Sequence, residues 1–149
     1  MPAFLSRAAR TRIKICGLTR EADVDAAVAA GADAIGFVLY PKSPRFVTPE
    51  RAAELARRLP PFVTPVLLFV NENAINIEAA CARVAGATMQ FHGDESAADC
   101  VAVARTTGRP FMRAARIPAP SSINIGCSLA KTNSCGSKTA CFSLKKATI

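Results

Sequence analysis

Residues 13–38 read IKICGLTREADVDAAVAAGADAIGFV, and the alternation within this stretch decides the fold. Short apolar runs at 13–16 and 34–38 are typical of buried strands, while the Ala-rich segment between them has the apolar spacing of a helix. We expect Thr19 to cap the start of that helix and Gly31 to end it in the left-handed conformation. A strand, a helix and a second strand in this order predict parallel pairing with a right-handed crossover.

The same alternation repeats along the chain. A helix start is expected where Thr48 precedes Pro49, and a helix end is expected at Gly108. Further strands are predicted at 66–70, 88–91 and 110–113, and further helices from Thr48 to the prolines at 60–61, from about 73 to 84, and from 94 or 96 to 107. The prediction is an α/β protein with five parallel strands and four helices.

The composition of the chain changes at Pro118. Residues up to Ile117 carry 15 basic and 11 acidic side chains, whereas those after it carry four lysines and no acid. A cluster of prolines and serines also interrupts the strand and helix pattern there. We therefore expect a flexible leader at 1–12, an ordered unit at 13–117 and an irregular tail at 118–149. A shifted reading frame is the leading explanation for the tail, because composition and pattern change together.

Composition also narrows the class of protein. Half of the 149 residues are hydrophobic, which is typical of a globular chain, and the longest apolar run, Val66 to Val70, is too short to span a membrane. The six cysteines without an export signal favour free thiols in the cytoplasm. The dispersed lysines of the tail are only a weak signal of nucleic-acid binding. Cys127, Cys135 and Cys141 include no CxxC pair, which is the spacing typical of a zinc site. We expect no nucleic acid, membrane or metal partner.

In a parallel strand–helix array, ligands collect where the strands end, so the residues that follow each predicted strand are the candidates for chemistry. Cys16 ends the first run and is either a base or nucleophile, or a small core residue. Arg45 lies in a loop with two prolines and either pairs with a carboxylate or belongs to a solvated loop. His92, the single histidine, follows the fourth run and either orients a substrate or is structural.

Four motifs resemble, in sequence and order, the phosphoribosylanthranilate isomerases of tryptophan biosynthesis. They are KICGLT at 14–19, GFVLYPKSPRFV at 36–47, LLFVN at 67–71 and MQFHGDE at 89–95. The resemblance covers residues 13–117 and implies a TIM (βα)8 barrel, of which this chain carries about five units. It also implies an aldose-ketose isomerase that rearranges the phosphosugar N-(5-phosphoribosyl)anthranilate to its ribulose isomer, by an Amadori rearrangement without metal or organic cofactor.

By this resemblance, Cys16 is the general base that removes the C2′ proton, Arg45 binds the anthranilate carboxylate, and His92 is a substrate-binding residue. The family's general acid is an aspartate at the end of the sixth strand, and its phosphate site uses glycine-rich turns after the seventh and eighth. No aspartate or glutamate follows Asp99 in this chain. We therefore expect that this chain has the general base and lacks the general acid. We expect little or no activity from the chain alone.

Two alternative functions remain open from the sequence. The first is a non-catalytic half-barrel that self-associates, or that pairs with a complementary fragment supplying the missing strands, because an unclosed sheet leaves its edges unpaired. The second is another phosphosugar barrel enzyme, such as an indole-glycerol-phosphate synthase or a pentose-phosphate epimerase. The KICG and PKSPR motifs disfavour this second alternative.

Overall fold

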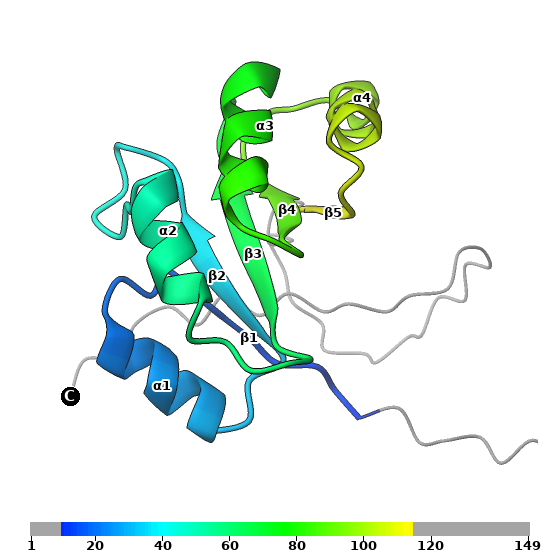
Figure 1. Ribbon diagram of the computed structural model, residues 1–149. Coiled ribbons are helices and arrows are strands. Elements are labelled where there is room, and N and C mark those ends of the chain that lie inside the picture. The colour runs from blue at the N-terminus through cyan, green and yellow to red at the C-terminus, as the bar shows by residue number, and fades with distance from the viewer. Residues whose placement is uncertain (1–9, 115–149) are drawn as a thin grey trace, which may run out of the picture.

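A computed structural model of the chain describes residues 10–114, in which five strands alternate with four helices (Figure 1). The elements are β1 (Lys14–Cys16), α1 (Glu21–Ala29), β2 (Ala34–Val38), α2 (Pro49–Ala56), β3 (Thr64–Phe69), α3 (Ala74–Arg83), β4 (Thr88–Phe91), α4 (Ala97–Thr107) and β5 (Phe111–Arg113). The predicted α/β class and the number and order of the elements are confirmed. The predicted tail at 118–149 and residues 1–9 of the predicted leader lie outside the described residues.

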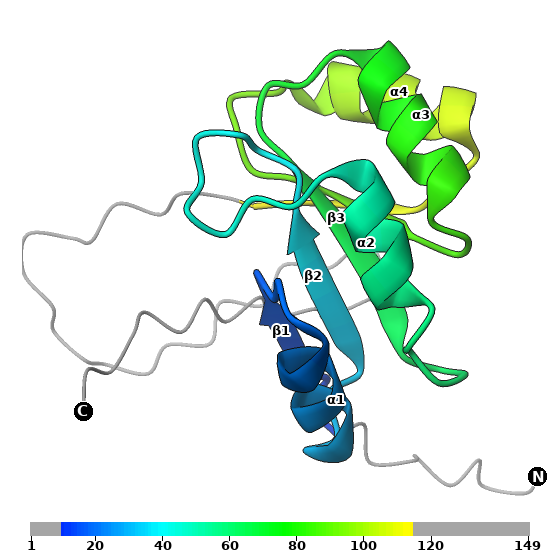
Figure 2. The same cartoon turned by 60° about the vertical axis from the view of Figure 1, so that its left-hand side comes forward.

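The strands form one parallel sheet in the order β1-β2-β3-β4-β5, so each strand pairs with its successor in the chain. Successive strand–helix–strand crossovers of one hand place the helices on a common side of the sheet, and Figure 2 shows α1 to α4 in that arrangement. Among the described residues, β1 and β5 each pair with a single neighbour and form the sheet edges. This is the topology of an open segment of a parallel barrel.

The two faces of the sheet have different neighbours. Alternate strand residues face the helices, and the phenylalanines Phe37, Phe69 and Phe91 are the largest of those that are fully buried. The rings of Phe69 and Phe91 lie 6.5 Å apart, and burial of each such side chain contributes about 1.5–3 kcal/mol. The intervening residues face the opposite side, and among them are Lys14 and Cys16 of β1.

The bounds of β3 differ from the prediction at its start. The sequence predicts a strand from Val66, after Pro65, because proline lacks the N–H that a sheet ladder uses. In the structure the strand begins at Thr64, whose N–H donates to the carbonyl of Asp33 at 2.9 Å. The ladder therefore starts before the proline, and Pro65 pairs in register with Ile35 without donating.

The predicted helix ends are mostly confirmed. Thr48 caps α2 by accepting from the N–H of Arg51 at 3.2 Å, and Gly31 and Gly108 have φ values of +86° and +64°. The prediction that Thr19 caps α1 is wrong, because the N-cap position is occupied by Arg20, which makes no side-chain cap.

The end of α2 also differs from the expected end at the two prolines. The regular helix stops at Ala56, and the chain continues in a tighter turn in which the N–H groups of Arg58 and Leu59 donate three residues back. Such turns are common where a helix unwinds before proline. No helix of the described residues is long and apolar enough to cross a membrane.

Candidate active site

The carboxyl ends of the five parallel strands meet at one edge of the sheet, which we call the rim. Cys16 ends β1, the loop 39–47 follows β2, Asn71 lies two residues after β3, and His92 directly follows β4. Parallel strands bring these residues to one edge although they are far apart in the sequence. The rim is therefore where the described residues place the predicted site.

Cys16 and Arg45 are brought together at the rim. The guanidinium Nη1 of Arg45 donates to the carbonyl oxygen of Cys16 at 2.9 Å, and the arginine side chain lies against Gly17. A Cβ atom at Gly17 would lie 2.5 Å from Nη1, and the φ of this glycine is +86°, so a side chain there would meet both strain and collision. The turn after Cys16 is thus shaped to receive the arginine.

The loop 39–47 holds the backbone of Arg45 in place. The N–H of Val47 donates to the carbonyl of Val38 at 2.9 Å, which brings the end of the loop back to β2. Within the loop, Ser43 donates to Tyr40 at 2.9 Å, and its hydroxyl accepts from the N–H of Arg45 at 3.2 Å. The arginine therefore projects from a folded turn, although its side chain is exposed.

Lys14 joins Cys16 on the face of the sheet away from the helices, and the sequence analysis missed it. A Cβ atom built on Gly36 would lie 2.6 Å from the Cys16 Sγ and 2.9 Å from the Lys14 Nζ. The thiol and the ammonium therefore converge on the space that the missing side chain leaves open. The two-residue period of a strand was the available signal, because it puts Lys14 and Cys16 on one face.

His92 lies at the rim without a hydrogen bond to Cys16 or Arg45 among the described residues. Its backbone N–H donates to the carbonyl of Phe69 at 2.9 Å, and its side chain is exposed. The structure therefore places His92 at the rim. It does not bring the imidazole into the Cys16–Arg45 contact.

Glu95 connects the loops after β3 and β4 with the end of β5. Its carboxylate accepts from the N–H groups of Asn71 at 2.7 Å and Gly93 at 2.9 Å. Its backbone carbonyl accepts from the Nε of Arg113 at 2.8 Å. This network fixes the segment that carries His92 and was not predicted from the sequence.

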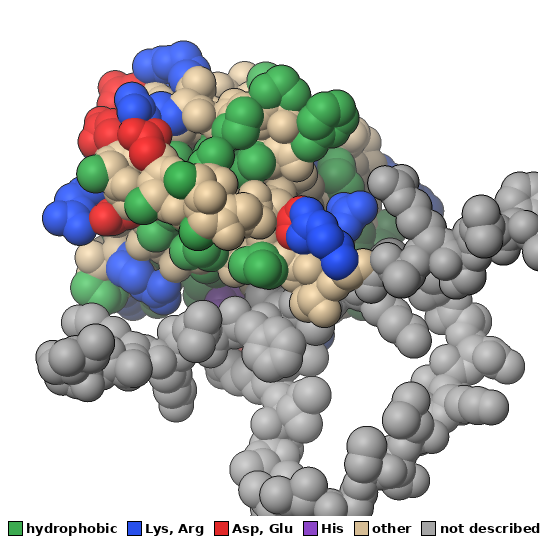
Figure 3. Space-filling view, turned by 90° about the horizontal axis from the view of Figure 1, so that it is seen from below, with side chains coloured by type: hydrophobic (Ala, Val, Ile, Leu, Met, Phe, Trp, Pro, Cys, Tyr) green, Lys and Arg blue, Asp and Glu red, His purple; other side chains and the backbone are tan. Residues whose placement is uncertain are grey.

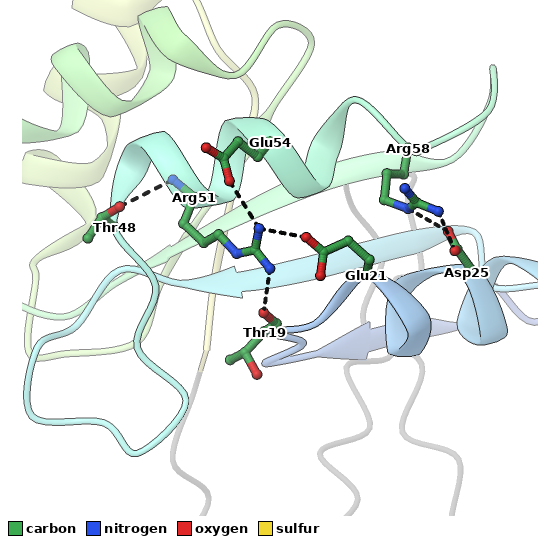
Figure 4. A network of polar contacts seen from close by, with 7 residues as sticks. All are labelled: Thr19, Glu21, Asp25, Thr48, Arg51, Glu54 and Arg58. Atoms are coloured by element: carbon green, nitrogen blue, oxygen red, sulfur yellow. Dashed lines mark hydrogen bonds and ion pairs between the residues drawn. The ribbon is translucent and has the colours of Figure 1, made fainter.

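Arg51 braces the beginning of α1 against α2, as Figure 4 shows. Its guanidinium contacts Glu21 at 2.7 Å and Glu54 at 3.0 Å, and it donates to the carbonyl of Thr19 at 3.4 Å. The hydrogen bond from Arg51 lowers the pKa of Glu21 to about 2. Because Thr19 lies in the turn that follows Cys16, this brace also fixes the rim beside the thiol.

Charged groups on the described surface are mixed. Figure 3 shows one face of the molecule, on which acidic side chains lie next to basic ones. Several of the arginines form ion pairs, such as Arg58 with Asp25 and Arg83 with Glu50. Within residues 10–114, no group of three or more metal-ligating side chains is placed to hold an ion. Cys127, the first cysteine of the tail, lies outside the described residues.

A hollow of about 320 Å³ lies on the helix side of the rim, between α2 and α3. Its lining includes Phe46, Phe69 and the Glu50–Arg83 ion pair, and does not include Cys16. The thiol is only partly exposed on the other face of the sheet. Cys16 and the hollow therefore lie on different faces of the sheet.

The sequence matches the family model "N-(5'phosphoribosyl)anthranilate (PRA) isomerase" over residues 13–135. Among curated relatives, the N-(5'-phosphoribosyl)anthranilate isomerase of Methylibium petroleiphilum is 66% identical over 108 residues, which are 72% of this chain and 49% of that protein. The isomerase of Leptothrix cholodnii is 62% identical over 109 residues, covering 73% and 48%. The chain spans about half the length of the curated relatives it matches.

Solved structures of the same kind are similar to the described fold. The phosphoribosyl anthranilate isomerase of Thermus thermophilus is 35% identical with a TM-score of 0.68, over 75% of this chain and 55% of that one. An isomerase in complex with reduced 1-(o-carboxyphenylamino)-1-deoxyribulose 5-phosphate is 39% identical with a TM-score of 0.66, over 70% and 53%. Both likenesses support the (βα)8 barrel family for this parallel sheet.

Proposed function

The chain belongs to the N-(5'-phosphoribosyl)anthranilate isomerase family, and from this premise we propose that its rim is the base-bearing half of an active site for N-(5'-phosphoribosyl)anthranilate. The reaction is the Amadori rearrangement of this aldose derivative to its ketose isomer in tryptophan biosynthesis. The observation that carries the proposal is the contact between Cys16 and Arg45. The contact is to the backbone carbonyl of Cys16, so it places the residue whose thiol can take a proton beside a guanidinium that can hold a carboxylate.

Cys16 is the proposed general base. When the sugar ring has opened to a protonated imine, the Sγ thiolate removes the proton from C2′, and the C–H electron pair forms the C1′–C2′ double bond. The imine electron pair returns to nitrogen, so the step needs no external oxidant or reductant. Cys16 is half-buried at the rim, so its thiol can approach a carbon-bound proton of the substrate. The sheet holds the thiol in place.

Arg45 is the proposed binding residue for the anthranilate carboxylate. One of its terminal nitrogens is bound to the Cys16 carbonyl at 2.9 Å, which leaves other guanidinium donors for a carboxylate. Because the same arginine contacts the residue that carries the base, binding of the carboxylate sets the distance from the aromatic ring to the thiol. His92 is a further proposed substrate-binding residue, supported by its place at the rim.

The described residues hold five strands, whereas the family's acid and phosphate turns belong to later strands. No carboxylate follows Asp99 in the sequence. We therefore propose that this chain alone binds ligand weakly and turns over little, in the cytoplasm where the pathway's small phosphosugars occur.

The binding part of the proposal is tested with reduced 1-(o-carboxyphenylamino)-1-deoxyribulose 5-phosphate and the full chain in a calorimeter. Arg45→Met should weaken binding about 10- to 100-fold, since a hydrogen bond to a charged group is worth about 1.5–3 kcal/mol. Arg57→Met is the matched control, because Arg57 is exposed at the end of α2 and its side chain makes no hydrogen bond or ion pair among the described residues. No binding by the unchanged chain, or equal losses in both variants, would reject the proposal.

The catalytic part is tested by following the fluorescence of the substrate. Cys16→Ala should remove whatever turnover the chain shows while leaving binding of the reduced analogue within about threefold, because the thiol acts in the chemical step. Loss of binding with retained turnover would reverse the assigned roles. Rapid turnover by the chain alone would contradict its proposed low activity.

The open sheet favours a second candidate, a half-barrel that associates with another chain. Both β1 and β5 have one partner strand among the described residues. A second copy or a complementary fragment supplying further strands would pair with these edges. The two candidates are compatible, because a partner that closes the sheet can also complete the rim.

A further inference from the structure

The convergence of Lys14 and Cys16 above Gly36 carries an inference beyond the assigned base and carboxylate site. The Lys14 Nζ and the Cys16 Sγ lie 2.9 Å and 2.6 Å from the same point, where a Cβ of Gly36 would be. Two atoms so placed are within about 6 Å of each other, the range over which charges in a half-buried site interact appreciably. Both side chains come from one three-residue strand and are half-buried.

Lys14 differs from those cations of the described fold that are paired with carboxylates. Arg10, Arg20, Arg51 and Arg58 each form an ion pair with a carboxylate. Lys14 makes no hydrogen bond and no ion pair within residues 10–114. The donors of its ammonium are therefore available to an acceptor on a ligand that lies beside Cys16.

We propose that the Lys14 ammonium donates a hydrogen bond to the oxygen carried by the carbon that Cys16 deprotonates. The identity of that ligand rests on the proposed function, in which the carbon is C2′ and the oxygen is its hydroxyl. A reacting carbon lies about 3–3.5 Å from the base, and the hydrogen bond from nitrogen to oxygen is about 2.9 Å long. The path from Sγ to Nζ runs through the carbon and its oxygen. If it is bent, the Sγ-to-carbon distance, the C–O bond and the oxygen-to-nitrogen hydrogen bond together fit the separation of Sγ and Nζ.

The chemistry uses such a cation in the second half of the rearrangement. Removal of the C2′ proton produces an enol, with its hydroxyl on C2′. When C1′ takes up a proton, the O–H electron pair becomes the second bond of the ketone and the hydroxyl proton leaves to solvent. Negative charge develops on this oxygen as its proton departs, and the nearby ammonium stabilises it. Lys14 donates a hydrogen bond throughout and transfers no proton.

Two alkylating reagents of different charge test whether the ammonium faces the atoms that approach Sγ. Iodoacetate carries a carboxylate one bond beyond the carbon that sulfur attacks, whereas iodoacetamide is neutral there. The ratio of their rates at Cys16 cancels the fraction of thiolate, because both reagents react with the same species. The full chain is used, and the modified tryptic peptide containing Cys16 is quantified by mass spectrometry, so the other cysteines do not interfere.

We expect Lys14→Met to lower the ratio of iodoacetate to iodoacetamide rates about three- to tenfold, as for loss of a unit charge at this range. Lys14→Arg should keep the ratio within about twofold, and so should Lys42→Met, which removes an exposed lysine of the rim loop. An unchanged ratio in folded Lys14→Met would overturn the proposal. So would an equal fall in Lys42→Met.

A second variant keeps the test valid if Lys14→Met does not fold. In Arg45→Met, Lys14 remains beside the thiol, and the ratio should stay above that of the free peptide ICGLTR. A ratio equal to that of the peptide would overturn the inference. Failure of the proposed function is seen separately, because it appears as absent binding of the reduced analogue and leaves this ratio unaffected.

Discussion

Two glycines leave the space in which the reactive side chains of the rim lie. Gly17 receives the guanidinium of Arg45, and Gly36 lies beneath Cys16 and Lys14. In both cases a single methyl group would fall within 3 Å of the functional atoms, at 2.5 Å from the Arg45 Nη1 and 2.6 Å from the Cys16 Sγ. The glycines therefore belong to the site although they contribute no chemistry of their own.

Replacement of Gly17 by alanine should weaken both folding and binding. The φ of +86° imposes about 1–2 kcal/mol of strain on a side chain, and the new methyl group displaces Arg45. Gly86→Ala is the matched control, because Gly86 has a φ of +69° with nothing within 4 Å of a new Cβ. Urea unfolding should show similar losses in both variants, whereas only Gly17→Ala should lose affinity for the reduced analogue. Equal affinities would show that Arg45 does not depend on this glycine.

For individual residues, the sequence points to those that lie in contiguous motifs. It misses those whose neighbours are set by the register of the paired strands. Cys16 and Arg45 were proposed as site residues because each lies in a run that resembles the family. Their contact spans 29 residues and depends on the pairing of β1 with β2, which no local pattern contains. For Lys14, the strand period alone places it on the face of Cys16, whereas its approach to Gly36 on the next strand depends on register.

Among the elements, α4 has the most complete N-terminal cap. The hydroxyl of Ser96 accepts from the N–H of Asp99 at 3.1 Å, and the Asp99 carboxylate accepts in return from the N–H of Ser96 at 3.2 Å. Ser96→Ala should lower the free energy of unfolding by about 1 kcal/mol. Thr106→Ala, on the exposed face of the same helix, should cost little, because its hydroxyl only bonds back to Ala102. Equal unfolding midpoints for both variants would contradict a stabilising cap.

The brace between α1 and α2 should make stability depend on pH. The pKa of Glu21 is about 2 in the folded chain against an ordinary value of 4.5, because Arg51 donates to its charged form. A folded pKa below the unfolded one means that the stabilisation is complete above about pH 4.5 and is lost as the pH falls toward 2. Urea unfolding at pH 3 and pH 6 should therefore differ less in Arg51→Met than in the unchanged chain.

Arg57→Met provides the control for this pH effect, since Arg57 lies next to the same helix without a carboxylate partner among the described residues. It should retain the pH dependence of the unchanged chain. If Arg51→Met and Arg57→Met behave alike, the brace does not contribute to acid sensitivity. The comparison distinguishes the effect of the Arg51–Glu21 ion pair on the pH dependence from the effect of removing one positive charge.

Helix ends could be predicted where the capping residue is local in the sequence. The prediction failed where a residue distant in the sequence makes a contact at the helix end. Thr48 and Ser96 bond to residues three positions ahead, so their sequence context is sufficient. The start of α1 was placed one residue too early, at Thr19, and the carbonyl of that residue is engaged by Arg51 of α2. The start of β3 likewise depends on Asp33, a residue of the preceding strand–helix unit.

For the whole molecule, the open edges predict association in solution. Sedimentation velocity across a range of concentrations should show assemblies larger than a monomer. Phe62 offers a competing explanation, because it is 99% exposed with a φ of +73°. Phe62→Asn, a residue that tolerates this conformation, should leave association unchanged if the sheet edges are responsible. A compact monomer at all concentrations would contradict the edge-pairing candidate.

The α/β class and the order of the sheet were predictable because each strand–helix unit repeats one pattern. How the sheet closes was not, because closure depends on strands beyond the described five. The boundary of the ordered unit at Ile117 remains a prediction. The relatives from Methylibium petroleiphilum and Leptothrix cholodnii align over 108 and 109 residues, whereas the family match continues to residue 135.

The pairing of each strand with its predecessor also bears on synthesis at the ribosome. Because the sheet order equals the chain order, every new strand emerges when its partner is already available. At about 5–20 residues per second, a strand–helix unit of roughly 20 residues takes a second or more to appear, while helices and short loops form within microseconds. Folding can therefore keep pace with translation, and the edge that awaits a new partner at any moment is the strand made last.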